Sequence, residues 1–291
     1  MQILDRVAGA ARLDPLSAAL TKLVDRVPVA VRDALHGVWL GHPVHPMLAQ
    51  LPVGAWTSAV LVDAVAVGLP DGDRRAGADR AAEALLAIGL AAAPATAAAG
   101  VTDWSKLLPE QQRVGLVHAS ANTVALGLLT TSLVRRRRGS GGRLLALAGV
   151  GVAAAAAGIG GHLSYRWAAG PNHAQDVPHV TPEDWADIGR LDEFAQRTPT
   201  LRRVGDTPVV VVRRGDSVTV LADHCSHLSG PLHEGQLIED GTDDCIVCPW
   251  HGSTFVLADG TVRHGPATAP QPGFDVQVDD GVVRARVRPP A

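Results

Sequence analysis

Four side chains of metal-binding type lie in two short segments of the C-terminal half of the sequence. Cys225 and His227 form a C-x-H motif, and twenty residues later Cys248 and His251 form a C-x-x-H motif. Thiolate and imidazole groups in such pairs bind tetrahedral zinc or an iron–sulfur cluster. The spacing therefore predicts a metal centre held by two tight loops, and by itself leaves both metals open.

The residues around these ligands distinguish the two metals. Cys225-Ser-His-Leu228 and Cys248-Pro-Trp-His-Gly252 resemble the paired motifs of the Rieske family of [2Fe–2S] proteins, and the resemblance covers about Trp185 to Val287. It implies that the two cysteines bind one iron and the two histidines the other. Two neutral imidazoles in place of thiolates leave less negative charge on the cluster, which then accepts an electron more readily. Structural zinc remains the alternative.

Residues beside the motifs suggest a branch within that family. Gly230 and Trp250 stand where the respiratory type has two further cysteines, and Phe255 stands where that type has a tyrosine hydroxyl. Ser253 keeps the serine hydroxyl, and Pro266 lies in a Gly-Pro-Ala segment that resembles the loop covering the cluster. With fewer hydrogen bonds to sulfur, the domain resembles the ferredoxin-like or oxygenase-type branch of lower potential.

Other residues of similar type are not expected to bind the metal. Cys245 falls on a predicted strand and is expected to be a buried apolar residue, whereas His224 and His233 are expected in loops or at the surface. A Rieske oxygenase also needs a catalytic domain with a His/His/carboxylate iron site. Only 40 residues follow His251, so we expect a carrier of electrons and not a complete oxygenase.

The domain that positions the loops is expected to be all-β. Turn sequences such as Asp259-Gly260 and Asp280-Gly281 are typical of hairpins and favour a small antiparallel sandwich or barrel. Seven short β-branched segments are predicted as its strands: Leu201–Val204, Val209–Val212, Val218–Leu221, Cys245–Val247, Thr254–Leu257, Phe274–Val278 and Val282–Val287.

The N-terminal half has the composition of a membrane domain. The chain is 46% apolar with a net charge of −3, divided between a basic first half and an acidic second half that argues against nucleic acid as a partner. Four nearly uncharged stretches reach about 20 residues, the length of a transmembrane helix. They are Met47–Leu69, Ala84–Val101, Val114–Val134 and Leu144–Leu163.

These patterns predict an all-α four-helix transmembrane bundle followed by an all-β Rieske-like antiparallel domain. The expected divisions are an amphipathic helical segment at 1–46, the bundle at 47–169, a linker at 170–184 and the Rieske domain at 185–290. Arginines gather in the loops at 70–80 and 135–143, and this charge bias favours a multi-pass protein of the cell membrane with its C-terminal domain on the extracytoplasmic face. We expect Asp63, inside the first span, to pair with one of these arginines or with a polar group of a helix.

A second set of residues lies near the opposite end of the spans. The entry Gly41-His-Pro-Val-His-Pro-Met47 resembles an uncharacterised four-helix membrane family. Ionisable groups in membranes often mark function, so we interpret five of these residues as a possible haem b or quinone site, with interfacial anchoring as the alternative: His42, His45, Asp103, His118 and His162.

Three functions remain open on the sequence. The first is a membrane-anchored carrier that passes one electron between a quinol or a redox partner protein and an acceptor. The second is a component of a multi-subunit oxygenase or quinol-linked reductase. The third is a redox or iron–sulfur sensor whose cluster state is transmitted to the bundle.

Overall fold

The computed structural model describes residues 2–289 and divides the chain into two compact units. One unit holds the N-terminal residues through Arg26 together with Val44–Ala169, and the other holds Val27–Pro43 together with the chain from Gly170 onward. The chain therefore enters the second unit briefly before its first long helix and returns to it after the last.

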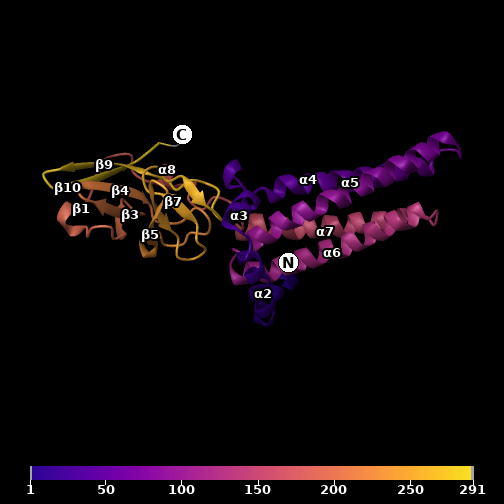
Figure 1. The fold of residues 1–291 in the computed structure, drawn as a ribbon, viewed down its shortest axis with the longest axis horizontal. Helices are drawn as coiled ribbons and strands as arrows, with labels where there is room; N and C mark the ends of the chain where they lie inside the picture. Colours follow the sequence, from indigo (N-terminus) through magenta and orange to yellow (C-terminus); the bar gives the residue numbers. More distant parts are fainter. Residues whose placement is uncertain (1, 290–291) are drawn as a thin grey trace. The chain divides into compact units, whose positions relative to one another are not determined.

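The first unit is built from helices. Four long helices form two hairpins, with α4 beside α5 and α6 beside α7 (Figure 1). Two shorter helices and a 3₁₀ turn precede them. The elements are α1 (Gln2–Ala8), η1 (Ala11–Leu13), α2 (Asp14–Asp25), α4 (His45–Val67), α5 (Asp73–Trp104), α6 (Pro109–Arg137) and α7 (Arg143–Trp167).

All four long helices are long and apolar enough to cross a membrane. They contain between 23 and 32 residues, which at 1.5 Å per residue is about 35 to 48 Å. The hydrocarbon core of a bilayer is about 30 Å thick. Each of the four predicted spans is one long helix, as expected: α5, α6 and α7 begin earlier than predicted because charged residues at their ends continue the helical turns, and α4 ends two residues before Leu69.

A buried ion pair lies between the two hairpins. Asp63 on α4 is 5% exposed, and its carboxylate accepts a hydrogen bond of 2.9 Å from Nη1 of Arg136 on α6. Nε of Arg143, at the start of α7, lies 3.6 Å from the same carboxylate. The expected pairing of Asp63 with arginine is confirmed.

The second unit is antiparallel throughout its strands. Its three sheets have the orders β1-β10-β9, β2-β3-β4 and β5-β6-β7-β8. The strands are β1 (Ala186–Arg190), β2 (Thr200–Val204), β3 (Thr207–Arg214), β4 (Ser217–Ala222), β5 (Gln236–Asp240), β6 (Asp243–Val247), β7 (Thr254–Val256), β8 (Val262–His264), β9 (Phe274–Asp279) and β10 (Val282–Val287). Short helical elements accompany them: α3 (Val29–His36), η2 (Val38–Leu40), α8 (Val177–Val180), η3 (Leu191–Glu193) and η4 (Leu232–Glu234).

Two apolar clusters form the core of this unit. One gathers around Phe194, Val209 and Phe274 between the first two sheets. The other includes Cys225 and Cys248 together with buried residues such as Phe255. The two candidate loops are therefore anchored in the hydrophobic core by their cysteines, whereas His227 and His251 are only half-buried.

Candidate metal centre

The two candidate loops have the same backbone geometry. The first follows β4, and the second connects β6 to β7. In the first, Cys225 N–H donates to the carbonyl of Gly230 (2.9 Å), and Ser229 N–H donates to the carbonyl of Cys225 (2.8 Å). In the second, Cys248 N–H donates to the carbonyl of Ser253 (2.8 Å), and Gly252 N–H donates to that of Cys248 (3.1 Å).

The fourth residue after each cysteine turns the chain in the same way. Ser229 has φ of 60° and Gly252 has φ of 79°, which is the left-handed region. Each loop is thus a turn closed by two backbone hydrogen bonds, one donated by the N–H of its cysteine and one accepted by the carbonyl of the same cysteine. The two turns therefore place their cysteines in equivalent positions, while His227 follows its cysteine by two residues and His251 by three.

The four predicted ligands lie together as two pairs. Cys225 and Cys248 are 1% and 3% exposed, and their thiols hydrogen-bond to each other. His227 and His251 are half-buried, and their ring centroids are 5.1 Å apart. Among the described residues, no three such side chains surround a single ion site. A buried sulfur pair beside a more exposed imidazole pair fits a two-iron cluster with two ligands on each iron.

Gly230 allows the loops to approach each other. A Cβ at this position would lie 2.7 Å from Sγ of Cys248 and 3.1 Å from Cγ of Trp250. Real Cβ atoms are not found so close to sulfur, so any side chain here would push the second loop away. This packing requires a glycine at Gly230, the position where the respiratory type has a further cysteine.

Backbone and side-chain donors stabilise negative charge on the sulfurs. The pKa of Cys248 is lowered to about 7, first by the hydrogen bond from Cys225 and then by the N–H groups of Trp250 and His251. The pKa of Cys225 is raised well above its ordinary 9.0, first by the hydrogen bond with Cys248 and then by burial. The Ser253 hydroxyl acts in the opposite direction on Cys225 and stabilises its thiolate.

A third loop packs against the second. Ala267 N–H donates to Oγ of Ser253 (3.0 Å), and both residues are buried. Pro266 is buried next to them, and Phe255 is fully buried on β7. Trp250 differs from these: its side chain is 51% exposed, and its ring lies 6.3 Å from that of His251.

Gln271 holds the backbone of the first loop, although no sequence pattern indicated a role for it. Its Nε2 donates to the carbonyls of Ala222 and His224, both at 2.7 Å, and its Oε1 accepts from Ser226 N–H (3.0 Å). The side chain is 1% exposed. Because its amide hydrogen-bonds to three backbone groups between Ala222 and Ser226, it fixes the backbone from which the side chains of Cys225 and His227 project.

The other residues of ligand type are engaged elsewhere. Cys245 is buried on β6, as expected. His224 is exposed, and His233 is held by Asp223, whose carboxylate oxygen lies 2.8 Å from His233 Nδ1. Asp223 is 2% exposed, and its Oδ1 also accepts the N–H of His233.

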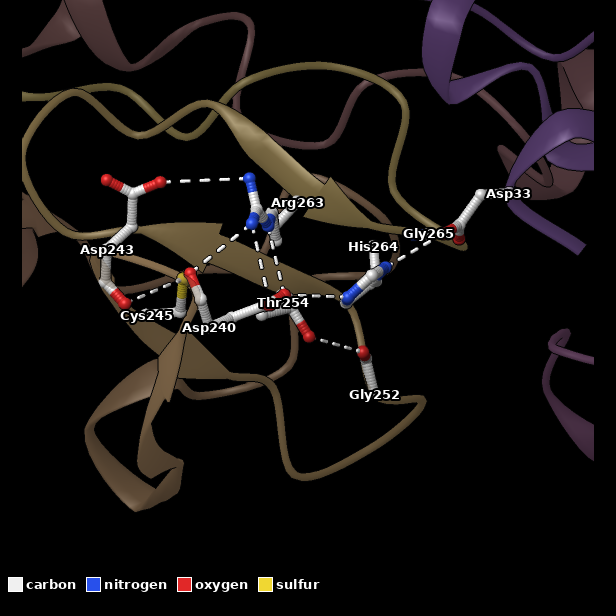
Figure 2. Close-up of polar contacts among 9 residues, drawn as sticks. All are labelled: Asp33, Asp240, Asp243, Cys245, Gly252, Thr254, Arg263, His264 and Gly265. Carbon is white, nitrogen blue, oxygen red and sulfur yellow. Dashed lines mark hydrogen bonds and ion pairs between the residues drawn. The ribbon is translucent and has the colours of Figure 1, made fainter. Parts of the chain in front are cut away.

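A segment distant in sequence holds the start of the third loop. In the second unit, Asp33 of α3 lies 2.8 Å from Nδ1 of His264 and accepts the N–H of Gly265 at 2.9 Å. Nε2 of His264 lies 2.9 Å from Asp240, so the imidazole sits between two carboxylates (Figure 2). Arg263 Nε donates to the same Asp240 carboxylate at 3.0 Å. This network fixes the residue that precedes Pro266.

The Asp240 carboxylate should make the network sensitive to acid. Its pKa lies below the ordinary 3.8 because Arg263 and then His264 hydrogen-bond to the charged form. A depressed folded-state pKa gives stability that is present above pH 3.8 and lost as the pH falls through the folded value. We expect the hydrogen-exchange protection factors of 236–240 and 262–267, corrected for the intrinsic pH dependence of exchange, to fall below pH 3.8 in the wild type. Asp240→Asn should exchange faster already at pH 6 and respond less to acid, unlike Asp216→Asn in an exposed turn.

The bundle residues assigned to a possible cofactor site do not all meet. His45 on α4 and His118 on α6 have ring centroids 6.5 Å apart. Each ring places Nδ1 against a carbonyl of a neighbouring helix, His45 on Thr96 (2.9 Å) and His118 on Ala156 (2.8 Å). A Cβ on Gly100 would lie 2.7 Å from the His45 ring, so a glycine is needed there.

The three remaining members have other described contacts or positions. The ring of His162 packs on Trp167 at 5.6 Å. Asp103 lies in the last turn of α5. His42 belongs to the second unit, where its Nδ1 lies 3.1 Å from the carbonyl of Pro43.

Comparisons with known proteins match both units. The model of the Rieske [2Fe-2S] domain matches residues 184–278, and that of a predicted membrane protein family, DUF2231, matches residues 41–171. An anthranilate 1,2-dioxygenase ferredoxin subunit from Burkholderia cepacia is 34% identical over 111 residues, which are 38% of this chain and 99% of that protein. Ferredoxin CarAc from Metapseudomonas resinovorans is 40% identical over 83 residues, 28% of this chain and 74% of that protein.

One solved structure illustrates the same similarity. The ferredoxin of carbazole 1,9a-dioxygenase from Nocardioides aromaticivorans IC177 is 29% identical, with a TM-score of 0.34. The match covers 36% of this chain and 98% of that one.

Proposed function

Because the chain belongs to the Rieske [2Fe–2S] family and its residues 41–171 match the model of the predicted membrane proteins DUF2231, we propose that it is a membrane-anchored one-electron carrier. The observation that carries the proposal is the pairing of two buried thiols with two half-buried imidazoles on loops of equal geometry. When bound, a [2Fe–2S] cluster takes up and releases one electron at a time.

Each side chain then has a separate role at the centre. Cys225 and Cys248 would hold one iron of the cluster from within the apolar core, which keeps water from the sulfurs. His227 and His251, which are half-buried, would hold the outer, second iron. N–H groups of Trp250 and His251 and the hydroxyl of Ser253 stabilise negative charge on the cysteine sulfurs.

The imidazole face is the proposed route for the electron. His227 and His251 are the more exposed ligands, and the exposed Trp250 ring lies beside His251. A redox partner protein that covers this face would come close to the outer iron. The ferredoxin subunits among the relatives favour such a protein partner over a direct quinol reaction. The same chain could serve as the Rieske component of a multi-subunit oxidoreductase, which co-purification of a partner with its own redox centre would identify.

Reversible uptake of one electron per chain tests the proposal. The full chain in a neutral detergent is titrated coulometrically through a set of mediators. We expect a single reversible transition of one electron per chain. A cluster that is destroyed by reduction, or that fails to pass its electron to any soluble one-electron acceptor, would instead favour a sensor.

Replacing Ser253 with alanine should lower the reduction potential. The substitution removes one hydrogen bond to the sulfur of Cys225, and a bond of about 1 kcal/mol corresponds to about 40 mV for one electron. It also leaves Ala267 N–H without its acceptor. The control is Ser226→Ala, because the Ser226 hydroxyl donates to the carbonyl of Ala269. An equal shift in both variants would contradict this role of Ser253.

The side of the membrane occupied by the second unit is proposed from charge. Arginines at 74, 75, 80, 135–138 and 143 cluster at the helix ends that flank the α4–α5 and α6–α7 loops, with Arg138 alone lying in a loop. The positive-inside rule makes those loops cytoplasmic and the Rieske unit extracytoplasmic. Proteolysis of sealed, right-side-out vesicles should remove the Rieske unit, and complete protection would reverse the assignment.

The His45–His118 pair is a second candidate redox site. Both rings are oriented through Nδ1 by backbone carbonyls, an arrangement typical of histidines that bind a metal through Nε2. Nε2 of His118 is 3.2 Å from the amide nitrogen of Asn122, which would have to move away. The pair would serve haem b as ligands or a quinone as hydrogen-bond partners. Absence of a Soret band after haem supplementation would reject haem b, and absence of a quinone extracted with the purified protein would reject the quinone.

A further inference from the structure

A charged cavity of about 650 Å³ lies at the arginine-rich end of the helical unit. Residues from the beginning of α5, the end of α6 and the beginning of α7 line it. Its charged members are four arginines and two acidic residues: Arg80, Arg135, Arg136, Arg143, Asp79 and Glu83. The cavity therefore has an excess of positive charge.

Two of the arginines are neutralised within the bundle, and two are not. Arg136 and Arg143 pair with Asp63, and Arg143 also pairs with Asp79. Among the residues that the structure describes, Arg80 has no carboxylate partner. Arg135 donates only to a backbone carbonyl, that of Ser140, at 2.9 Å. The positive charge of Arg80 and Arg135 is thus available to a ligand.

The loop between α6 and α7 leaves the space open. Gly139, Gly141 and Gly142 all line the cavity and have φ of 68°, 77° and 140°. These backbone conformations favour glycine, so no side chains project from them into the cavity. An anion of the size of a phosphate can approach the two arginines from this side.

The other wall of the cavity is apolar. Leu144 and Leu145 line it at the start of α7. Leu144 is 82% exposed and Leu147, one turn further along, is 56% exposed. These leucines continue into the apolar surface of a helix long enough to span a membrane. A ligand with an anionic head and an apolar tail would satisfy both walls.

We propose that this cavity binds the phosphate headgroup of an anionic phospholipid. The guanidinium groups of Arg80 and Arg135 pair with phosphate oxygens, for which their planar donors are suited. The acyl chains lie along the exposed leucines of α7. Free phosphate shares the chemistry of the headgroup and lacks the apolar part, so the two sources can be separated by experiment. Basic pockets at the ends of membrane helices bind anionic headgroups in this way.

The test compares lipids on the full chain in a neutral detergent. Phosphatidylglycerol is titrated into the micelles, and the thermal unfolding midpoint gives an apparent dissociation constant. We expect stabilisation by phosphatidylglycerol, and none by phosphatidylcholine, sn-glycerol 1-phosphate or inorganic phosphate at equal concentration. A response to inorganic phosphate as large as that to phosphatidylglycerol would overturn the lipid assignment, and an equal response to phosphatidylcholine would overturn the anionic site.

Matched variants locate the binding site. Arg80→Gln/Arg135→Gln should bind phosphatidylglycerol about 30-fold more weakly, the effect expected of two arginines at a membrane surface. Arg74→Gln/Arg138→Gln removes the same charge from α5 and from the residue that follows α6, both outside the cavity, and should bind as the wild type does. Equal weakening in both would overturn the proposal. Native mass spectrometry of the wild type is a second measurement, which does not depend on how a variant folds. We expect it to show more phosphatidylglycerol than phosphatidylcholine retained on the protein.

Discussion

Replacing His251 with alanine is expected to remove the iron–sulfur centre from the protein. His251 is one of the two imidazoles proposed as ligands of one iron, and changes to groups that merely support a metal ligand already weaken binding 10- to 100-fold. Loss of a ligand should therefore lower iron and acid-labile sulfide by more than about tenfold. The measurement is iron and sulfide per chain in anaerobically purified protein, with the visible absorption spectrum recorded alongside.

His224 provides the control for that substitution. It is exposed in the first loop, next to Cys225, and it carries the same type of side chain. His224→Ala should keep full iron and sulfide content. If His251→Ala retained the cluster with an unchanged spectrum, the assignment of His251 as a ligand would be wrong.

The second large effect is expected in the bundle, at the ion pair of Asp63 and Arg136. The two side chains are only 7% and 8% exposed. Arg136→Met leaves the Asp63 carboxylate buried with the more distant Arg143 as its remaining partner. Breaking a buried pair from one side costs about 3 to 5 kcal/mol, so the helical unit should unfold at a markedly lower temperature, as measured by circular dichroism in detergent.

A double variant separates the ion pair from packing. Asp63→Leu/Arg136→Met removes both charges and should recover most of the loss, because an apolar pair avoids the cost of burying ions. Arg138→Met, at an exposed position of the same helix end, should have little effect. A double variant no more stable than Arg136→Met would contradict the argument and would show that packing at these positions dominates.

The candidate ligands could be located from the sequence because the signal for them is local. Cys225 and His227 are two residues apart, Cys248 and His251 are three apart, and the turns that present them close over five residues. The helices of the bundle could equally be predicted from the sequence. A segment in lipid must satisfy its own backbone hydrogen bonds, which favours a helix, and about 20 apolar residues are needed to cross the bilayer. All seven predicted strands are present, with most extended by one or two residues.

The missing elements carry weaker patterns. Three strands were not predicted: β1 contains a glycine, and β5 and β8 contain charged residues whose ion pairs keep them at the surface. The short helix α8 lies in the segment interpreted as a linker. Turn residues and charges dominate such short segments, and their pairing is set by the rest of the sheet.

Supporting residues distant in sequence had no local signal at all. Gln271 lies more than forty residues from the backbone groups that it binds, and Asp33 lies 231 residues from His264. Nothing in the sequence assigns the 27–43 segment to the same compact unit as the Rieske domain. Contacts of this kind follow from the tertiary fold, and only a structure reveals them.

Electron paramagnetic resonance of the reduced full chain, recorded through a redox titration, tests the central claim most directly. A binuclear iron centre with two thiolate and two imidazole ligands predicts a Rieske-type signal that appears in a single one-electron transition, in protein that contains two irons and two acid-labile sulfides. Protein that contains zinc, lacks acid-labile sulfide and gives no signal on reduction would contradict it.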